Sequence, residues 1–94
     1  MTIFLTRRAE RNYNSIKKYI AKEFGGKTAE TFTKKADETF KLLEDFPQMG
    51  PAENNDIRGF QLSRQTRILY RIREKKIIIL SLFDVRQNPK KRPG

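Results

Sequence analysis

The sequence predicts a small α+β domain in which two helices pack on one face of an antiparallel sheet. Three observations support this fold class. Apolar residues recur at helical spacing through the first half of the chain, turn-forming residues cluster in the middle, and apolar and charged residues alternate at strand spacing after them. The chain has 94 residues, so residues 1–94 are expected to form a single domain around one hydrophobic core.

The amino-terminal half predicts one short strand followed by a helical hairpin. Residues 2–5 are apolar enough for a strand, and Thr6 can cap the next helix through its hydroxyl group. Gly25 and Gly26 end the first helix, and Pro47 ends the second. Each helix has one apolar face, which indicates packing in the core. These faces comprise Ala9, Tyr13, Ile16, Ile20 and Phe24, and then Ala29, Phe32, Ala36, Phe40, Leu43 and Phe46.

The carboxy-terminal half predicts a loop and three strands joined by short turns. Residues 47–56 are rich in turn formers and are expected to form the loop. Residues 57–62 form the next strand, in which Gly59 marks either a bulge or a close approach of another group. Residues 66–73 alternate between apolar and charged, as in a strand with one buried face. Residues 77–85 are apolar at both parities, as expected of a central strand.

These elements fit a four-stranded antiparallel sheet of the order β-α-α-β-β-β along the chain. If the helical hairpin returns the chain to the end where the first strand stopped, the last three strands form a meander. The last strand then pairs antiparallel with the first. The expected order across the sheet is second, third, fourth, first (2-3-4-1), with both helices on one face. This order places the apolar strand in the interior.

Positive charge is concentrated in the predicted sheet. The net charge of the chain is +10 at neutral pH. Residues 1–56 contain ten Lys or Arg and nine Asp or Glu, a difference of +1, whereas residues 57–94 contain eleven and two, a difference of +9. A surface of this kind attracts nucleic acid or an acidic protein segment.

The composition excludes several kinds of chemistry. The sequence has no Cys and no His, so it lacks disulfides, a thiolate nucleophile, the usual general base and the commonest metal ligand. We expect no cofactor and no metal, and any catalysis would have to use Arg, Lys, Tyr or carboxylates. No apolar run approaches the length of a membrane span, and the amino terminus has no signal-peptide core. We therefore expect a cytoplasmic protein that does not act on membranes.

Arginines alternate with apolar residues along the third predicted strand. Three arginines on one face indicate a binding surface, and because aligned like charges cost stability, we expect an acidic partner to offset them. Arg86 follows the last strand and is expected either to pair with Asp84 or to contact a phosphate or a protein target. Residues 87–94 are expected to form a flexible basic tail. The candidate binding residues are Arg58, Arg64, Arg67, Arg71, Arg73, Arg86, Lys90 and Lys91.

The order and spacing of these elements resemble the RelE/ParE superfamily of bacterial toxins. The resemblance rests on four stretches, which read LEDFPQMG at 43–50, IRGF at 57–60, RILYRI at 67–72 and FDVRQNP at 83–89. It implies the toxin of a type II toxin–antitoxin pair, which inhibits growth and forms a hetero-oligomer with the cognate antitoxin that silences it. The resemblance also implies that the antitoxin lays an acidic, amphipathic segment on the sheet and helices.

The resemblance leaves two mechanisms open. RelE-like members cut mRNA in the ribosomal A site, whereas ParE-like members poison DNA gyrase. The RelE-like pattern implies two lysines on the second strand, arginines on the third strand and near the end of the fourth, and a tyrosine in the tail. Arg67 and Arg86 match these arginines, but Gln61 and Ser63 replace the lysines and no Tyr follows Arg86. Arginine stays protonated in proteins, so neither arginine can serve as a base.

We therefore expect a ParE-like inhibitor of gyrase. The alternative is a RelE-like, ribosome-dependent mRNA endonuclease in which Arg67 and Arg86 are catalytic. A second alternative is a small basic nucleic-acid-binding module outside the toxins. Such modules usually expose aromatic residues among their charges, whereas most aromatic residues of this chain lie on the predicted helix faces.

Overall fold

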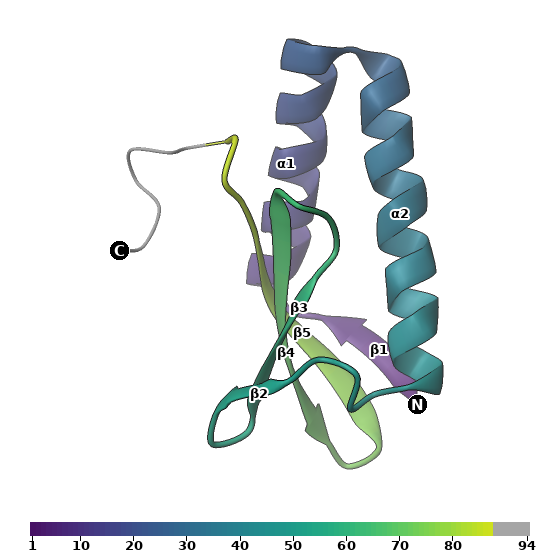
Figure 1. Cartoon of the computed structure of the whole chain (residues 1–94), viewed down its shortest axis with the longest axis vertical. Coiled ribbons are helices and arrows are strands. Elements are labelled where there is room, and N and C mark those ends of the chain that lie inside the picture. Colours follow the sequence, from purple (N-terminus) through teal and green to yellow (C-terminus); the bar gives the residue numbers. More distant parts are fainter. Residues whose placement is uncertain (88–94) are drawn as a thin grey trace.

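The computed structural model describes residues 1–87, which form two helices packed on a five-stranded mixed sheet (Figure 1). The sheet has the order β1-β5-β4-β3-β2. Lys90, Lys91 and the rest of the predicted basic tail after residue 87 lie outside the described residues. In chain order the elements are β1 (Thr2–Leu5), α1 (Arg7–Phe24), α2 (Gly26–Asp45), β2 (Ala52–Asn54), β3 (Ile57–Gln61), β4 (Thr66–Arg73) and β5 (Lys76–Asp84).

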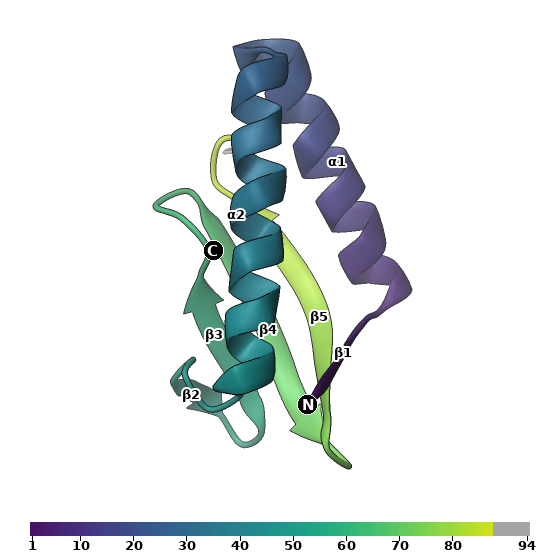
Figure 2. The same ribbon diagram turned by 90° about the vertical axis from the view of Figure 1, so that its right-hand side faces the viewer.

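The helical hairpin forms as the sequence predicts. Thr6 caps α1, because its hydroxyl oxygen accepts a hydrogen bond from the Ala9 amide at 3.0 Å. Gly25 separates the two helices with a φ of 95°, a conformation that glycine adopts without strain. Both helices cover the same face of the sheet, and α2 lies in front of β4 in the second view (Figure 2).

The direction of β1 was predicted wrongly. The four expected strands have the expected neighbours, but β1 pairs with β5 in parallel, with Ile3 opposite Ile77 and Leu5 opposite Ile79. The reason is the length of α2, whose 20 residues span roughly 30 Å at about 1.5 Å per residue. This helix returns the chain to the level where β1 begins, not where it ends. There the Met1 ammonium donates a hydrogen bond to the Glu44 carbonyl oxygen at 3.0 Å.

The sheet also has a fifth strand that the sequence did not indicate. Residues 52–54, expected to belong to a loop, form β2 at the edge of the sheet, where Ala52 lies opposite Arg58 and Asn54 opposite Ile57. All three residues of this strand are exposed. A stretch this short and polar carries no strand signal of its own, because only its pairing with β3 makes it a strand.

The core lies between the helices and the sheet. Two aromatic residues predicted for it are instead at the surface, since Phe24 is 51% and Phe46 60% exposed. Phe24 is the last residue of α1 and Phe46 caps the end of α2, so helical spacing alone does not reveal that they extend beyond the packed region. The buried apolar residues are Ala9, Ile16, Ile20, Ala29, Phe32, Ala36, Leu43, Leu62, Ile68, Tyr70, Ile77, Ile79 and Leu82.

A bulge in β5 determines which of its residues reach the core. Leu69 pairs with Ser81 while the next residue, Tyr70, pairs with Ile79, so Leu80 is an extra residue in β5. Before the bulge the odd-numbered residues Ile77 and Ile79 are buried, and after it the even-numbered Leu82 and Asp84 are buried. Apolar residues therefore occur at both odd and even positions of β5 for two reasons: the strand is central, and the bulge changes which positions face the core.

The free edge of β5 beyond β1 is covered by α1. The Thr6 amide and hydroxyl donate hydrogen bonds to the carbonyl oxygens of Ile79 and Leu80 at 3.1 and 3.0 Å. Farther along, the Leu82 amide donates to the side-chain oxygen of Asn12 at 3.1 Å. These bonds satisfy backbone groups that would otherwise lack partners, and they fix α1 along the sheet.

Within residues 1–87, no helix combines the length and apolar character needed to cross a membrane. The same residues contain no group of three or more Asp or Glu side chains arranged to hold a metal ion.

Tyr70 fixes the loop between α2 and β2. Its side chain is fully buried, and its hydroxyl donates to the Pro47 carbonyl oxygen at 2.8 Å and accepts from the Gly50 amide at 2.9 Å. Gly50 permits this approach, because a Cβ there would lie 2.8 Å from the Tyr70 hydroxyl. Arg58 adds a hydrogen bond from Nη1 to the Gly50 carbonyl oxygen at 2.8 Å. The loop thereby sets the position of β2.

We predict that Tyr70→Phe lowers the free energy of unfolding by about 1–3 kcal/mol, because it leaves the Gly50 amide and the Pro47 carbonyl without their partner. Urea denaturation followed by circular dichroism measures this change. Tyr13→Phe is the matched control, since the Tyr13 hydroxyl has no hydrogen-bond partner in the described part of the chain. Equal destabilisation by the two substitutions would contradict the role assigned to the Tyr70 hydroxyl.

Candidate functional site

The arginines of β4 lie on the face of the sheet that points away from the helices, which we call the open face. Thr66, Ile68 and Tyr70 are fully buried on the helix side, so the residues between them project to the other side. Strand pairing then places their neighbours on β3 and β5 beside them. The open face comprises Glu53, Ile57, Gly59, Gln61, Arg67, Leu69, Arg71, Arg73, Lys76, Ile78, Ser81 and Phe83.

Arg67 is paired within the chain. Its guanidinium forms an ion pair with Glu53 of β2, and its Nη1 donates to the side-chain oxygen of Gln61 at 3.1 Å. The pair lies across Gly59, where a Cβ would overlap both side chains. The close approach predicted at Gly59 is confirmed, and glycine is needed there because the Arg67–Glu53 pair occupies the space.

Arg71 and Arg73 share Asp56 in the turn between β2 and β3. Arg73 donates a hydrogen bond to the Asp56 carboxylate, and the Nη1 atom of Arg71 lies 3.9 Å from the same oxygen. The hydrogen bond from Arg73, aided by the charges of both arginines, holds the pKa of Asp56 below its usual value. The sequence predicts an acidic partner for these arginines, and Asp56 of the chain itself supplies part of that negative charge.

Arg86 lies on the helix side of the sheet, away from Arg67. Its Nε and Nη2 atoms donate to the two Asp84 carboxylate oxygens at 3.0 and 2.8 Å, which confirms the predicted pairing with Asp84. Its guanidinium carbon lies 5.6 Å from the centre of the Phe24 ring at the end of α1. The fold therefore does not bring the guanidinium groups of Arg67 and Arg86 together.

Asp84 positions Arg86. It is 2% exposed, and besides its bonds to Arg86 it accepts a hydrogen bond from the Thr66 hydroxyl at 2.6 Å. Burial alone would raise the pKa of Asp84, but the hydrogen bonds from Arg86 and Thr66 outweigh burial and hold the pKa below its usual value of 3.8. The same contact raises the pKa of Arg86. The carboxylate thus stays charged and keeps the guanidinium in one orientation.

The other predicted residues have different surroundings. Arg58 supports the fold, because its Nη1 atom donates to the carbonyl oxygens of Gln48 and Gly50. Arg64 is exposed in the turn after β3 and has neither an ion pair nor a side-chain hydrogen bond to the described residues.

Sequence reasoning missed Arg8. This residue of α1 and Asn12 border a shallow hollow at the edge of the open face, together with Arg67, Leu69 and Phe83. Its position in the sequence indicated only an exposed helix residue. The path of α1 along the edge of β5, which brings Arg8 beside the sheet arginines, depends on tertiary packing.

We predict that Glu53→Gln strengthens binding to polyanions, because it releases the Arg67 guanidinium. The variant should elute from a heparin column at a higher salt concentration than the wild-type protein. Glu38→Gln on α2 is the matched control, since it changes the net charge equally but lies away from the open face. If both variants elute at the same higher salt concentration, net charge alone determines heparin binding. That result would contradict the inference that Glu53 keeps the Arg67 guanidinium from binding polyanions.

We predict that Asp84→Asn destabilises the protein by about 2 kcal/mol at neutral pH, because it breaks a largely buried ion pair. Since the folded-state pKa of Asp84 is lowered, its contribution is fully present above the unfolded-state value near 3.8. The contribution falls as the pH drops from that value through the folded-state pKa.

Urea unfolding of Asp84→Asn across this acidic range tests the pH dependence. The stability difference from wild type should shrink on acidification, and a difference that grows would refute the assignment. Asp37→Asn, at an exposed position of α2, should have little effect at any pH.

Comparisons with known proteins agree on the kind of domain. A family model described as the ParE toxin of the type II toxin–antitoxin system parDE matches residues 3–89. A structure of the chromosomal ParDE toxin–antitoxin system from P. aeruginosa matches with a TM-score of 0.76 and 24% sequence identity, covering 89% of this chain and 95% of that chain. The YoeB dimer from Staphylococcus aureus matches with a TM-score of 0.61 and 16% identity, covering 88% and 94%.

A search of curated proteins gave no significant match. The two solved structures support the fold, and the family model extends over nearly the whole chain. The chain therefore belongs to the ParE toxin family of type II toxin–antitoxin systems.

Proposed function

We propose that this protein inhibits bacterial growth by binding DNA gyrase through the open face, and that a cognate antitoxin neutralises it in a hetero-oligomer. The observation that carries the choice of gyrase over RNA cleavage is the set of side chains around Arg67. Cleavage by the 2′-hydroxyl needs a group that accepts a proton, a group that stabilises the phosphorane charge and a group that protonates the leaving oxygen.

Within residues 1–87, the surroundings of Arg67 supply only part of this set. Arg67 can stabilise negative charge, and Glu53 beside it is a carboxylate that can accept a proton. Arg8, Asn12 and Ser81, the other polar residues around the adjacent hollow, include no acid able to protonate the leaving oxygen. Arg86 points to the other face. The Glu53–Arg67 pair is the one observation that favours the alternative, a RelE-like endonuclease.

The composition of the open face suits a protein partner. Leu69, Ile78 and Phe83 are half-buried between the arginines, so the face offers apolar area together with charge. Interfaces between proteins are enriched in arginine and aromatic residues, and such residues supply much of the binding energy. A partner whose carboxylates compete with Glu53 and Asp56 for the arginines would match this surface.

The excess of positive charge in residues 57–94 supports an acidic antitoxin. Binding of such a partner would offset the positive charge of the β4 arginines more fully than Glu53 and Asp56 do. Both proteins are then expected in one complex, and separation of the complex releases an active toxin.

We predict that the purified protein inhibits gyrase supercoiling and leaves RNA intact. Arg67→Ala should weaken the inhibition by about tenfold, because it removes a central arginine of the interface. Lys41→Ala on α2 removes one positive charge elsewhere and should have no comparable effect.

Supercoiling assays and mapping of RNA ends, run in parallel, separate the two mechanisms. Codon-proximal RNA cuts that disappear in Arg67→Ala would establish the endonuclease instead. Unimpaired growth of bacteria that express the folded protein without its antitoxin would contradict the toxin function itself.

A further inference from the structure

Helix α1 carries a row of positive side chains along one face. Arg8, Arg11, Lys18 and Lys22 are all exposed. With Ser15 between them they recur every three or four residues, a spacing that aligns side chains on one side of a helix. From Arg8 to Lys22 the row extends roughly 21 Å, at about 1.5 Å per residue. We call these four residues the cationic row.

The charges of the cationic row are not balanced within α1. Residues 7–24 contain six Lys or Arg and two Asp or Glu, a difference of +4. No residue of the row has a carboxylate three or four positions away in the sequence. Instead, Arg8 with Arg11 and Lys18 with Lys22 form like-charged pairs at these spacings. Such pairs, and arginine in the first helical turn, weaken a helix, so helix stability does not account for the row.

Helix α2 has the opposite charge pattern. Each of its four lysines has a carboxylate three or four positions away, as Lys34 has in Glu30 and Glu38. Residues 26–45 contain these four lysines and five Asp or Glu, a difference of −1. Opposite charges at these spacings stabilise a helix and offset each other. The positive charge of the helical hairpin is therefore concentrated on α1.

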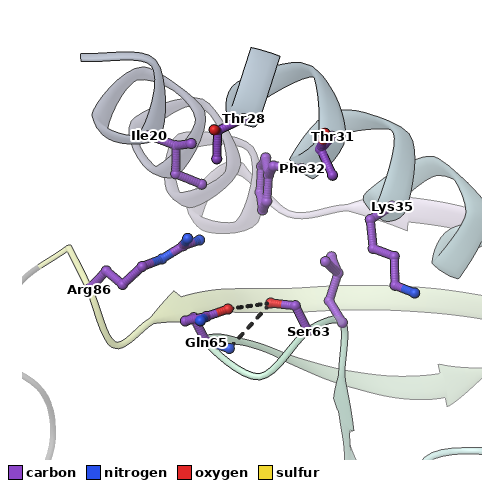
Figure 3. A pocket seen from close by; sticks show the side chains of 9 residues that line it. Ile20, Thr28, Thr31, Phe32, Lys35, Ser63, Gln65 and Arg86 are labelled. Carbon is purple, nitrogen blue, oxygen red and sulfur yellow. Dashed lines mark hydrogen bonds between the residues drawn. The ribbon is translucent and has the colours of Figure 1, made fainter. Parts of the chain in front are cut away.

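The cationic row meets the open face at Arg8. Arg8 and Arg67 border the same shallow hollow, beside the edge of β5 that α1 covers. Arg86 does not join this surface, because its side chain points into the space between the helical hairpin and the sheet, toward Ile20 (Figure 3). Positive charge therefore extends from the β4 arginines through Arg8 and along α1 to Lys22.

We propose that the cationic row binds the phosphate backbone of duplex DNA without reading its sequence. Contacts from Arg and Lys to phosphates position a protein on DNA but carry no sequence information directly. Each strand of a duplex carries a negative charge about every 3.4 Å along the axis, so a row of roughly 21 Å can reach several phosphates at once. This DNA binding goes beyond the proposed function and does not require gyrase.

The composition of the row selects duplex DNA over other acidic partners. The five residues at the spacing of the row, with Ser15 included, are all charged or polar. A protein interface usually has an apolar centre, which this face does not offer. Proteins that bind single strands stack the bases on aromatic side chains, and the row contains none. Charge without apolar or aromatic surface matches the backbone of a duplex.

The double variant Lys18→Gln/Lys22→Gln tests the inference. Fluorescence anisotropy with a labelled DNA duplex of about 20 base pairs measures the Kd of the full chain over a range of salt concentrations. We expect the Kd to rise at least about tenfold at low salt. The slope of log affinity against log salt should fall by about 2, because each lost phosphate contact lowers it by about 1. Duplexes of unrelated sequence should give the same losses.

The matched control is Lys34→Gln/Lys41→Gln, which makes the same substitutions at exposed positions of α2. It changes the net charge equally, and its Kd should stay within about threefold of wild type. Arg11→Gln/Lys22→Gln is an independent second test of the row. Circular dichroism of every variant verifies that the helices form.

The outcomes separate this inference from the proposed function. Equal losses in the test and control variants would show that net charge alone determines DNA binding and would overturn the inference. Tighter binding to a single strand of the same length would overturn it as well. So would binding of polyglutamate that the Lys18→Gln/Lys22→Gln variant loses while it keeps its affinity for DNA. Intact DNA binding by a wild-type protein that does not inhibit gyrase would contradict the proposed function alone.

Discussion

The pairing of β4 with β5 is the interaction on which the positions of Arg67 and of the Asp84–Arg86 pair depend. In this register Thr66 lies opposite Asp84 on the helix side, and the next residue, Arg67, lies opposite Phe83 on the open face. A slip of one residue would turn the side chains of one strand to the wrong face, exposing Asp84 and burying charge. The hydrogen bond between Thr66 and the Asp84 carboxylate holds this register through side chains as well as through the backbone.

The extra residue at Leu80 decides where Arg86 points. Counting alternate residues from the buried Ile77 would place Arg86 on the open face beside Arg67, because side chains alternate along a regular strand. The bulge changes which alternate residues of β5 face the helices, from odd-numbered to even-numbered positions. Asp84 is therefore buried, and Arg86, two residues later, also lies on the helix side. One inserted residue thus separates Arg67 and Arg86, the two arginines that the resemblance to RelE-like toxins implies for one catalytic site.

The helices and the alternation along β4 could be predicted from the sequence because both follow from local periodicity. The parallel direction of β1 could not, since it depends on how far α2 runs back past the start of the chain. β2 is similarly non-local, because its three polar residues become a strand only beside β3. Within the candidate site, the pairing of Arg86 with Asp84 was predictable from their proximity in the sequence. The masking of Arg67 by Glu53 was not, because it requires the fold to bring β2 across Gly59.

The two acidic residues of the β2 hairpin explain how the sheet tolerates its arginines. Three like charges on one strand face repel each other, and Glu53 and Asp56 offset this repulsion in the free protein. These pairs are partly exposed and individually weak, so a partner with better-placed carboxylates can replace them at small cost. Arg86, on the helix side, has a stronger counterion in the buried Asp84, which accepts two hydrogen bonds from its guanidinium. A partner of the open face must therefore displace Glu53 and Asp56 from the arginines before it can bind them.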